Sequence, residues 1–80
     1  MDNKERGRQA AWLLEQESFR QAIDTCALYC QMKWANTAPE DTQQRELFYH
    51  QFAAVHSIEE MLKNFVEDGV RQEREENGNE

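Results

Sequence analysis

The scarcity of helix-breaking residues constrains this chain more than any other feature. Its 80 residues include one proline and three glycines. Gly7 lies near the start, Gly69 and Gly78 lie near the end, and Pro39 alone interrupts the residues between them. Strands need frequent turns, and turns are rich in glycine and proline. The distribution therefore predicts an all-α protein with a few long helices.

The clearest boundary surrounds the proline, in the run Asn36-Thr37-Ala38-Pro39-Glu40-Asp41. Thr37 and Glu40 have the spacing of a capping box, in which each side chain bonds to a free backbone amide of the other residue. Pro39 falls in the first turn, where its missing N–H costs nothing. A helix is predicted to begin at Thr37.

Downstream of this boundary the apolar residues follow a helical period. They form a stripe of about three residues in seven, which is typical of a core-facing bundle helix: Leu47, Phe48, Phe52, Ala54, Val55, Ile58, Met61, Leu62, Phe65 and Val66. Gly69 is expected to cap the C-terminal end of this helix. Residues 1–69 would then form a single helical domain, and residues 70–80 a flexible acidic tail.

Upstream of the boundary, apolar residues recur at three- and four-residue steps and predict a helix from Ser18 to Ala35. A shorter apolar segment, residues 10–14, precedes it. Ser18 and Gln21 fit a weaker capping box, so a break is expected at residues 15–18. The predicted fold is an antiparallel helical hairpin with a short N-terminal helix. Either that helix packs across the hairpin, or two hairpins pair into a four-helix bundle.

The small size and the acidic charge of the chain indicate which kinds of partner it can bind. A core this small gives little net stability, which favours a homo-oligomer or another protein partner. The 16 acidic residues exceed the 9 basic ones and give a formal net charge of -7, which disfavours nucleic-acid binding. No apolar run has the length of a signal peptide or a membrane span. We expect a cytoplasmic protein with both cysteines reduced.

Catalytic and metal-binding patterns are weak. Cys26 and Cys30 lie four residues apart on one helix face, where core packing is the simpler interpretation. His50 and His56 are six apart and would lie on different faces, so they cannot easily share one metal ion. No glycine-rich turn or long loop could expose a nucleophile. We expect neither enzymatic activity nor a metal or other cofactor.

The aromatic residues are the strongest candidates for a contact with another protein. Eight of them are present, and most should lie in the core. Tryptophan and tyrosine at the edge of a small bundle can form the centre of a binding surface, because an apolar ring then carries a polar group that reaches water or a partner. The predicted protein interface consists of Trp12, Trp34, Tyr49 and Phe52.

Several segments together resemble short helical-hairpin proteins of tailed bacteriophages and prophages. The segments are Trp12-Leu13-Leu14, Phe19-Arg20-Gln21-Ala22, Trp34 to Thr42, Arg45-Glu46-Leu47 and Val66-Glu67-Asp68-Gly69. The resemblance implies a non-enzymatic structural or virion-assembly protein that acts through helix-mediated association, in the host cytoplasm or in the virion. The alternative is a small acidic phage protein that binds and modulates a host protein, with carboxylates that stand in for nucleic-acid phosphates.

Overall fold

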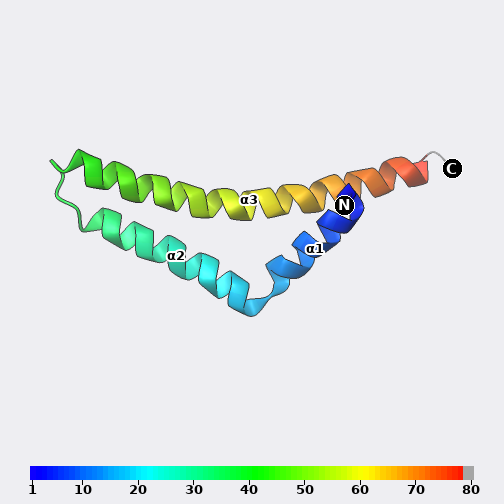
Figure 1. Ribbon diagram of the computed structural model, residues 1–80, viewed down its shortest axis with the longest axis horizontal. Coiled ribbons are helices and arrows are strands. Elements are labelled where there is room, and N and C mark those ends of the chain that lie inside the picture. Colours follow the sequence, from blue (N-terminus) through cyan, green and yellow to red (C-terminus); the bar gives the residue numbers. More distant parts are fainter. Residues whose placement is uncertain (79–80) are drawn as a thin grey trace.

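The computed structural model describes residues 1–78, and these residues form three helices and no strand. The helices are α1 (Asn3–Glu15), α2 (Glu17–Ala35) and α3 (Thr42–Gly78). The prediction of an all-α protein is therefore confirmed. Both α1 and α2 pack chiefly against α3 rather than against each other. Figure 1 shows α2 and α3 running in opposite directions from the 36–41 loop, with α1 near the C-terminal half of α3.

The break between α1 and α2 is a single residue, Gln16. Its φ of -73° and ψ of 123° are extended, while its backbone N–H still donates to Leu13 O and its side-chain amide donates to Trp12 O at 3.0 Å. The predicted break at residues 15–18 is confirmed. The predicted capping box at Ser18 is wrong, because the cap of α2 is Gln16 and the Gln21 side-chain amide bonds to Glu17 Oε1 instead.

The start of α3 also differs from the prediction. The helix begins at Thr42, and Asp41 Oδ1 accepts a hydrogen bond from the backbone N–H of Gln44 at 3.2 Å, as an N-terminal cap does. Thr37 instead closes the end of α2, where its hydroxyl donates to Trp34 O at 2.6 Å. The predicted capping box of Thr37 and Glu40 is therefore wrong, and Pro39 lies in the loop before the helix.

The end of α3 differs more. Gly69 does not cap the helix, which continues to Gly78, and no glycine in the described chain has a positive φ. The predicted tail is therefore helical as far as it is described, and its last two residues lie outside the described range. Gly69 meets Gly7 of α1 where the two helices cross. A Cβ on Gly7 would lie 2.8 Å from Phe65 O and 3.3 Å from Gly69 Cα. The two glycines let the backbones approach this closely.

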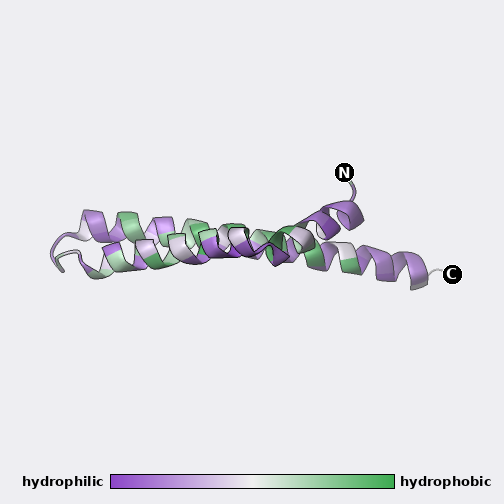
Figure 2. Ribbon diagram, turned by 90° about the horizontal axis from the view of Figure 1, so that it is seen from below, coloured by the Kyte–Doolittle hydropathy of each residue, from purple (hydrophilic) through white to green (hydrophobic). Residues whose placement is uncertain are grey.

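The core is thin. On α3 the residues that face α1 and α2 follow one another at steps of three and four, and all are half-buried or buried: Phe48, Phe52, Val55, Glu59, Leu62, Val66 and Gly69. Among the described residues, Ala10 and Cys30 alone are buried apolar residues. The molecule measures 61 × 24 × 17 Å, and Figure 2 shows hydrophobic segments along its middle and hydrophilic ends.

Candidate protein-association surfaces

Three of the four predicted interface residues lie in one groove. Trp34 from α2 and Tyr49 and Phe52 from α3 line a groove of ≈ 250 Å³ near the 36–41 loop, together with Cys30, Gln31 and Phe48. We call it the turn-end groove. Trp34 is 39% exposed and Tyr49 is 59% exposed, while Phe52 is half-buried. The groove therefore presents aromatic surface, and its floor is held by the α2–α3 contact.

Polar contacts hold the tryptophan of this groove in place. The guanidinium of Arg45 lies 4.3 Å from the centre of the Trp34 ring, a cation–π distance. Arg45 also donates to the hydroxyl of Thr37 at 3.3 Å, and that hydroxyl donates in turn to Trp34 O. This chain of contacts ties α2 to the first turn of α3. It orients Trp34 at the rim of the groove.

Trp12, the fourth predicted residue, lies in a different place. It is 62% exposed on α1 and borders a wider groove of ≈ 700 Å³, which Leu13, Leu62 and Phe65 also line. The Arg6 guanidinium lies 4.1 Å from the centre of the Phe65 ring in this groove. The structure therefore does not bring Trp12 together with Trp34, Tyr49 and Phe52. The predicted single interface divides into two apolar surfaces.

A third apolar surface was not predicted. Leu47, Ile58 and Met61 were assigned to the core-facing stripe of α3, yet they are 48%, 53% and 52% exposed. Each precedes a covered residue by one position (Phe48, Glu59 and Leu62), which turns it about 100° around the helix axis. The sequence shows the spacing of these residues. It does not show which part of the wide apolar stripe the other helices cover.

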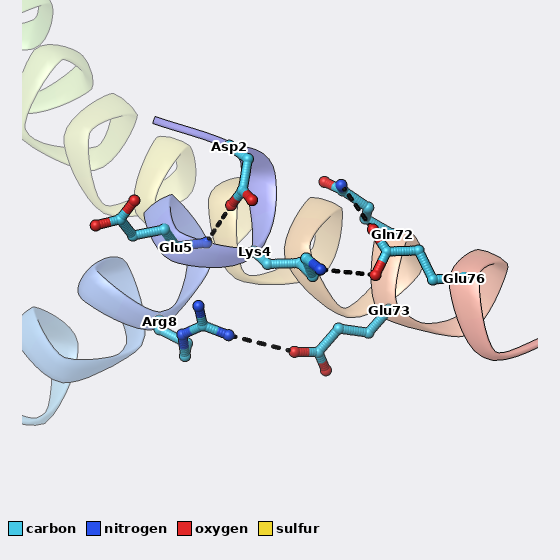
Figure 3. Close-up of polar contacts among 7 residues, drawn as sticks. All are labelled: Asp2, Lys4, Glu5, Arg8, Gln72, Glu73 and Glu76. Atoms are coloured by element: carbon cyan, nitrogen blue, oxygen red, sulfur yellow. Dashed lines mark hydrogen bonds and ion pairs between the residues drawn. The ribbon is translucent and has the colours of Figure 1, made fainter.

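Ion pairs also join the C-terminal part of α3 to α1. Lys4 Nζ lies 2.6 Å from Glu76 Oε2, and Arg8 lies 3.6 Å from Glu73 (Figure 3). The hydrogen bond from Lys4 lowers the pKa of Glu76, with help from Gln72, and the same bond raises the pKa of Lys4. The backbone N–H of Glu5 donates to Asp2 and lowers the pKa of that carboxyl. Lys4 is half-buried and the other charged groups are exposed, so the pairs orient α1 more than they stabilise it.

The cysteines and histidines do not converge on a site. Cys30 is buried and lines the turn-end groove, as core packing predicts, whereas Cys26 is exposed, contrary to that prediction. His56 packs edge-on against Phe52, with ring centres 4.7 Å apart. Within residues 1–78 no three histidine, cysteine or acidic side chains gather as a metal site would require. None of the helices in this range is both long and apolar enough to cross a membrane.

Comparison with known proteins adds no relative. No protein-family model, no curated protein and no solved structure matches this chain.

Proposed function

We propose that this protein is a non-enzymatic association module, a structural or assembly component that acts by docking its apolar helix surfaces on another protein. One observation carries the proposal. Eleven large hydrophobic residues are exposed, whereas the buried apolar residues of the described chain are only Ala10 and Cys30. Contiguous exposed apolar surface on a small protein is typical of a contact with another macromolecule.

The kind of side chain supports a protein partner. The turn-end groove combines tryptophan, tyrosine and phenylalanine, the aromatic residues enriched in the centres of protein interfaces. Its tryptophan is already held by Arg45 and by its own backbone bond to Thr37, so little side-chain freedom is lost on binding. The setting we propose is the phage assembly role that the resemblance implies, with the hairpin of α2 and α3 as the docking element.

Photocrosslinking in the organism that encodes the protein tests this proposal. A photoreactive benzoyl-phenylalanine is introduced at Tyr49 or at Trp12, and at Glu60 as an exposed polar control on α3. We expect covalent adducts to a protein from position 49 or 12 and none from position 60. If neither apolar position yields an adduct, docking of a partner at the turn-end groove and beside Trp12 is wrong.

The alternative function, an acidic modulator of a host protein, receives no specific support. Lys4, Arg6 and Arg8 of α1 lie 2.6 to 3.7 Å from Glu76, Asp68 and Glu73. Carboxylates that serve as phosphate mimics need to be free to meet the cations of the partner. Here three of them already lie beside cations of their own chain, which favours a role in placing α1.

A further inference from the structure

We infer that a second copy of this chain docks antiparallel on an uncharged flank of α3, so that the protein is a symmetric dimer. This inference deepens the proposed function by naming its partner. The flank consists of Leu47, Gln51, Ala54, Ile58, Met61 and Phe65, with His50, Ser57 and Asn64 along its outer edge. All are exposed except Phe65, which is half-buried.

The spacing of the flank is that of a helix–helix seam. Its six central residues follow one another at steps of four, three, four, three and four. Each pair of steps spans seven residues, and a seven-residue repeat of this kind keeps a stripe facing a partner helix along its whole length. The stripe lies one position before the seam that α1 and α2 already cover, so α3 carries two seams side by side and its own chain covers one.

The charges of α3 avoid this flank. Between residues 45 and 66 the helix carries Arg45, Glu46, Glu59, Glu60 and Lys63, and every one lies outside the flank. Lys63 pairs with Glu59 at 3.1 Å on another side of the helix. The Arg6 guanidinium of α1 meets this flank at its Phe65 end, 4.1 Å from the ring centre. In a chain of net charge -7, nine flank positions without a charged side chain of their own are unexpected for a solvated face. The centres of protein interfaces are depleted of charge in this way.

The exposed area matches what a dimer would bury. A compact monomer of 9.5 kDa exposes about 5,000 Å², whereas this chain exposes 6231 Å². The excess is roughly 1,200 Å² per chain, and a standard interface buries about 800 Å² from each partner. Docking of a second copy through a standard interface would therefore remove about two thirds of the surface by which this chain exceeds a compact monomer of its mass.

Symmetry and charge point to the antiparallel orientation. The steps along the flank read the same in both directions, so a two-fold axis near residue 56 sets each of its central residues against another. Ala54 then faces Ile58 of the second copy, a small residue against a large one, and Leu47 faces Phe65. A parallel pair would instead bring together two C-terminal ends, each with six acidic residues and two arginines between Glu67 and Glu80.

Molar mass by light scattering, measured on the full chain across a dilution series, tests the dimer. We expect twice the chain mass of 9.5 kDa. In Ile58→Glu a carboxylate is buried in the centre of the interface, and we expect the dissociation constant to rise about a hundredfold. Leu28→Glu is the matched control, because Leu28 is 57% exposed but lies on α2, and this variant should stay dimeric. Circular dichroism checks that both variants keep their helices.

Cysteine crosslinking tests the orientation. In a Cys26→Ser, Cys30→Ala background, a cysteine is placed at His50, Ser57 or Asn64 in turn. In an antiparallel dimer position 57 lies beside its own symmetry mate, whereas positions 50 and 64 are separated by about 18 to 24 Å along the axis. Disulfide-linked dimers should therefore form only at position 57. Equal crosslinking at all three positions overturns the antiparallel arrangement.

The two proposals fail separately. A chain that stays monomeric at every concentration, or a dimer that Ile58→Glu leaves intact, overturns the inference of a second copy on α3. Adducts to a different protein from position 49 or 12 would still support the association function in that case. Absence of any adduct overturns docking of a partner at the turn-end groove and beside Trp12, and leaves the dimer to be judged by its own molar mass.

Discussion

At the scale of single residues, two different side chains of the loop between α2 and α3 end one helix and start the next. Thr37 bonds to the last turn of α2 and accepts from Arg45, and Asp41 caps the first turn of α3. The negative charge of Asp41 also lies beside the positive end of the α3 dipole. The sequence pattern predicted the helix start at Thr37, and only the hydrogen bonds show that Asp41 is the cap.

Replacement of Asp41 tests this division. Asp41→Ala removes the side-chain acceptor for Gln44 N–H, and we expect the free energy of unfolding to fall by about 1 kcal/mol. Asp41→Asn should retain most of the stability, since asparagine caps nearly as well. Chemical denaturation monitored by circular dichroism gives the values. A loss in Glu40→Ala as large as that in Asp41→Ala would instead support a helix start at Thr37.

How much the sequence could predict depends on what each residue contacts. The helical period, the break near Gln16 and the loop around Pro39 all follow from local patterns, and the structure has them. The roles of Gly69 and Ile58 do not, because each depends on where helices far along the chain pack. The role of Thr37 depends on which of its near neighbours its hydroxyl bonds to, and the sequence pattern favoured the wrong one. Three of the interface candidates meet in one groove, yet Trp12 could not be placed without knowing where α1 packs.

At the scale of helices, α1 and α3 form the most extensive contact in the molecule. Two glycines inside helices oppose local propensity, since each costs about 1 kcal/mol relative to alanine. Their use is explained by the crossing, where a Cβ on Gly69 would lie 2.8 Å from Asn3 O. The three- and four-residue spacing of the α3 residues that face α1 continues past Gly69 to Glu73 and Glu76. This continued spacing is the feature of the sequence that indicates a helix extending beyond Gly69.

Alanine substitutions at the glycines should therefore have opposite effects. Gly7→Ala and Gly69→Ala force backbone atoms apart, and we expect each to lower the free energy of unfolding by about 1 to 3 kcal/mol despite the better helix propensity. Gly78→Ala is the control, because a Cβ there meets no described atom within 4 Å and should raise helix stability slightly. Thermal denaturation of the three variants measures their relative stabilities. Equal stabilisation at all three positions would contradict the crossing.

The ion pair between Lys4 and Glu76 gives α1 a dependence on pH. The pKa of Glu76 is lowered in the folded chain, so its contribution is present above the ordinary value of 4.5 and is lost as pH falls through the lowered pKa. Below pH 4.5 we expect α1 to dock more weakly. Carbon NMR titration of the Glu76 carboxyl measures the effect, and in Lys4→Met its pKa should rise toward 4.5. An unchanged pKa in that variant would contradict the pairing.

At the scale of the whole molecule, the chain is long and thin. Its radius of gyration is 17.4 Å, whereas a compact domain of 80 residues has one of about 12 Å. An elongated shape with so thin a core leaves little apolar burial to offset the entropy of folding. A partner along the flank of α3 would supply the missing burial.

Stability should then depend on protein concentration. If docking of a second copy stabilises the fold, the melting temperature rises as the protein is concentrated, because mass action favours the dimer. We expect this rise in the wild-type chain and in Leu28→Glu, and its loss in Ile58→Glu. Calorimetric scans at several concentrations provide the measurement. Identical melting temperatures across the series would contradict a stabilising dimer.

The crossing of Gly7 and Gly69 also sets an order of events during synthesis. α1 leaves the ribosome well before the part of α3 on which it packs, and a loop of about sixty residues must close before it docks. α2 and the first half of α3, joined by a short loop, can pair earlier. Until the end of α3 emerges, α1 lacks the helix against which it chiefly packs, and its apolar face is open to chaperones.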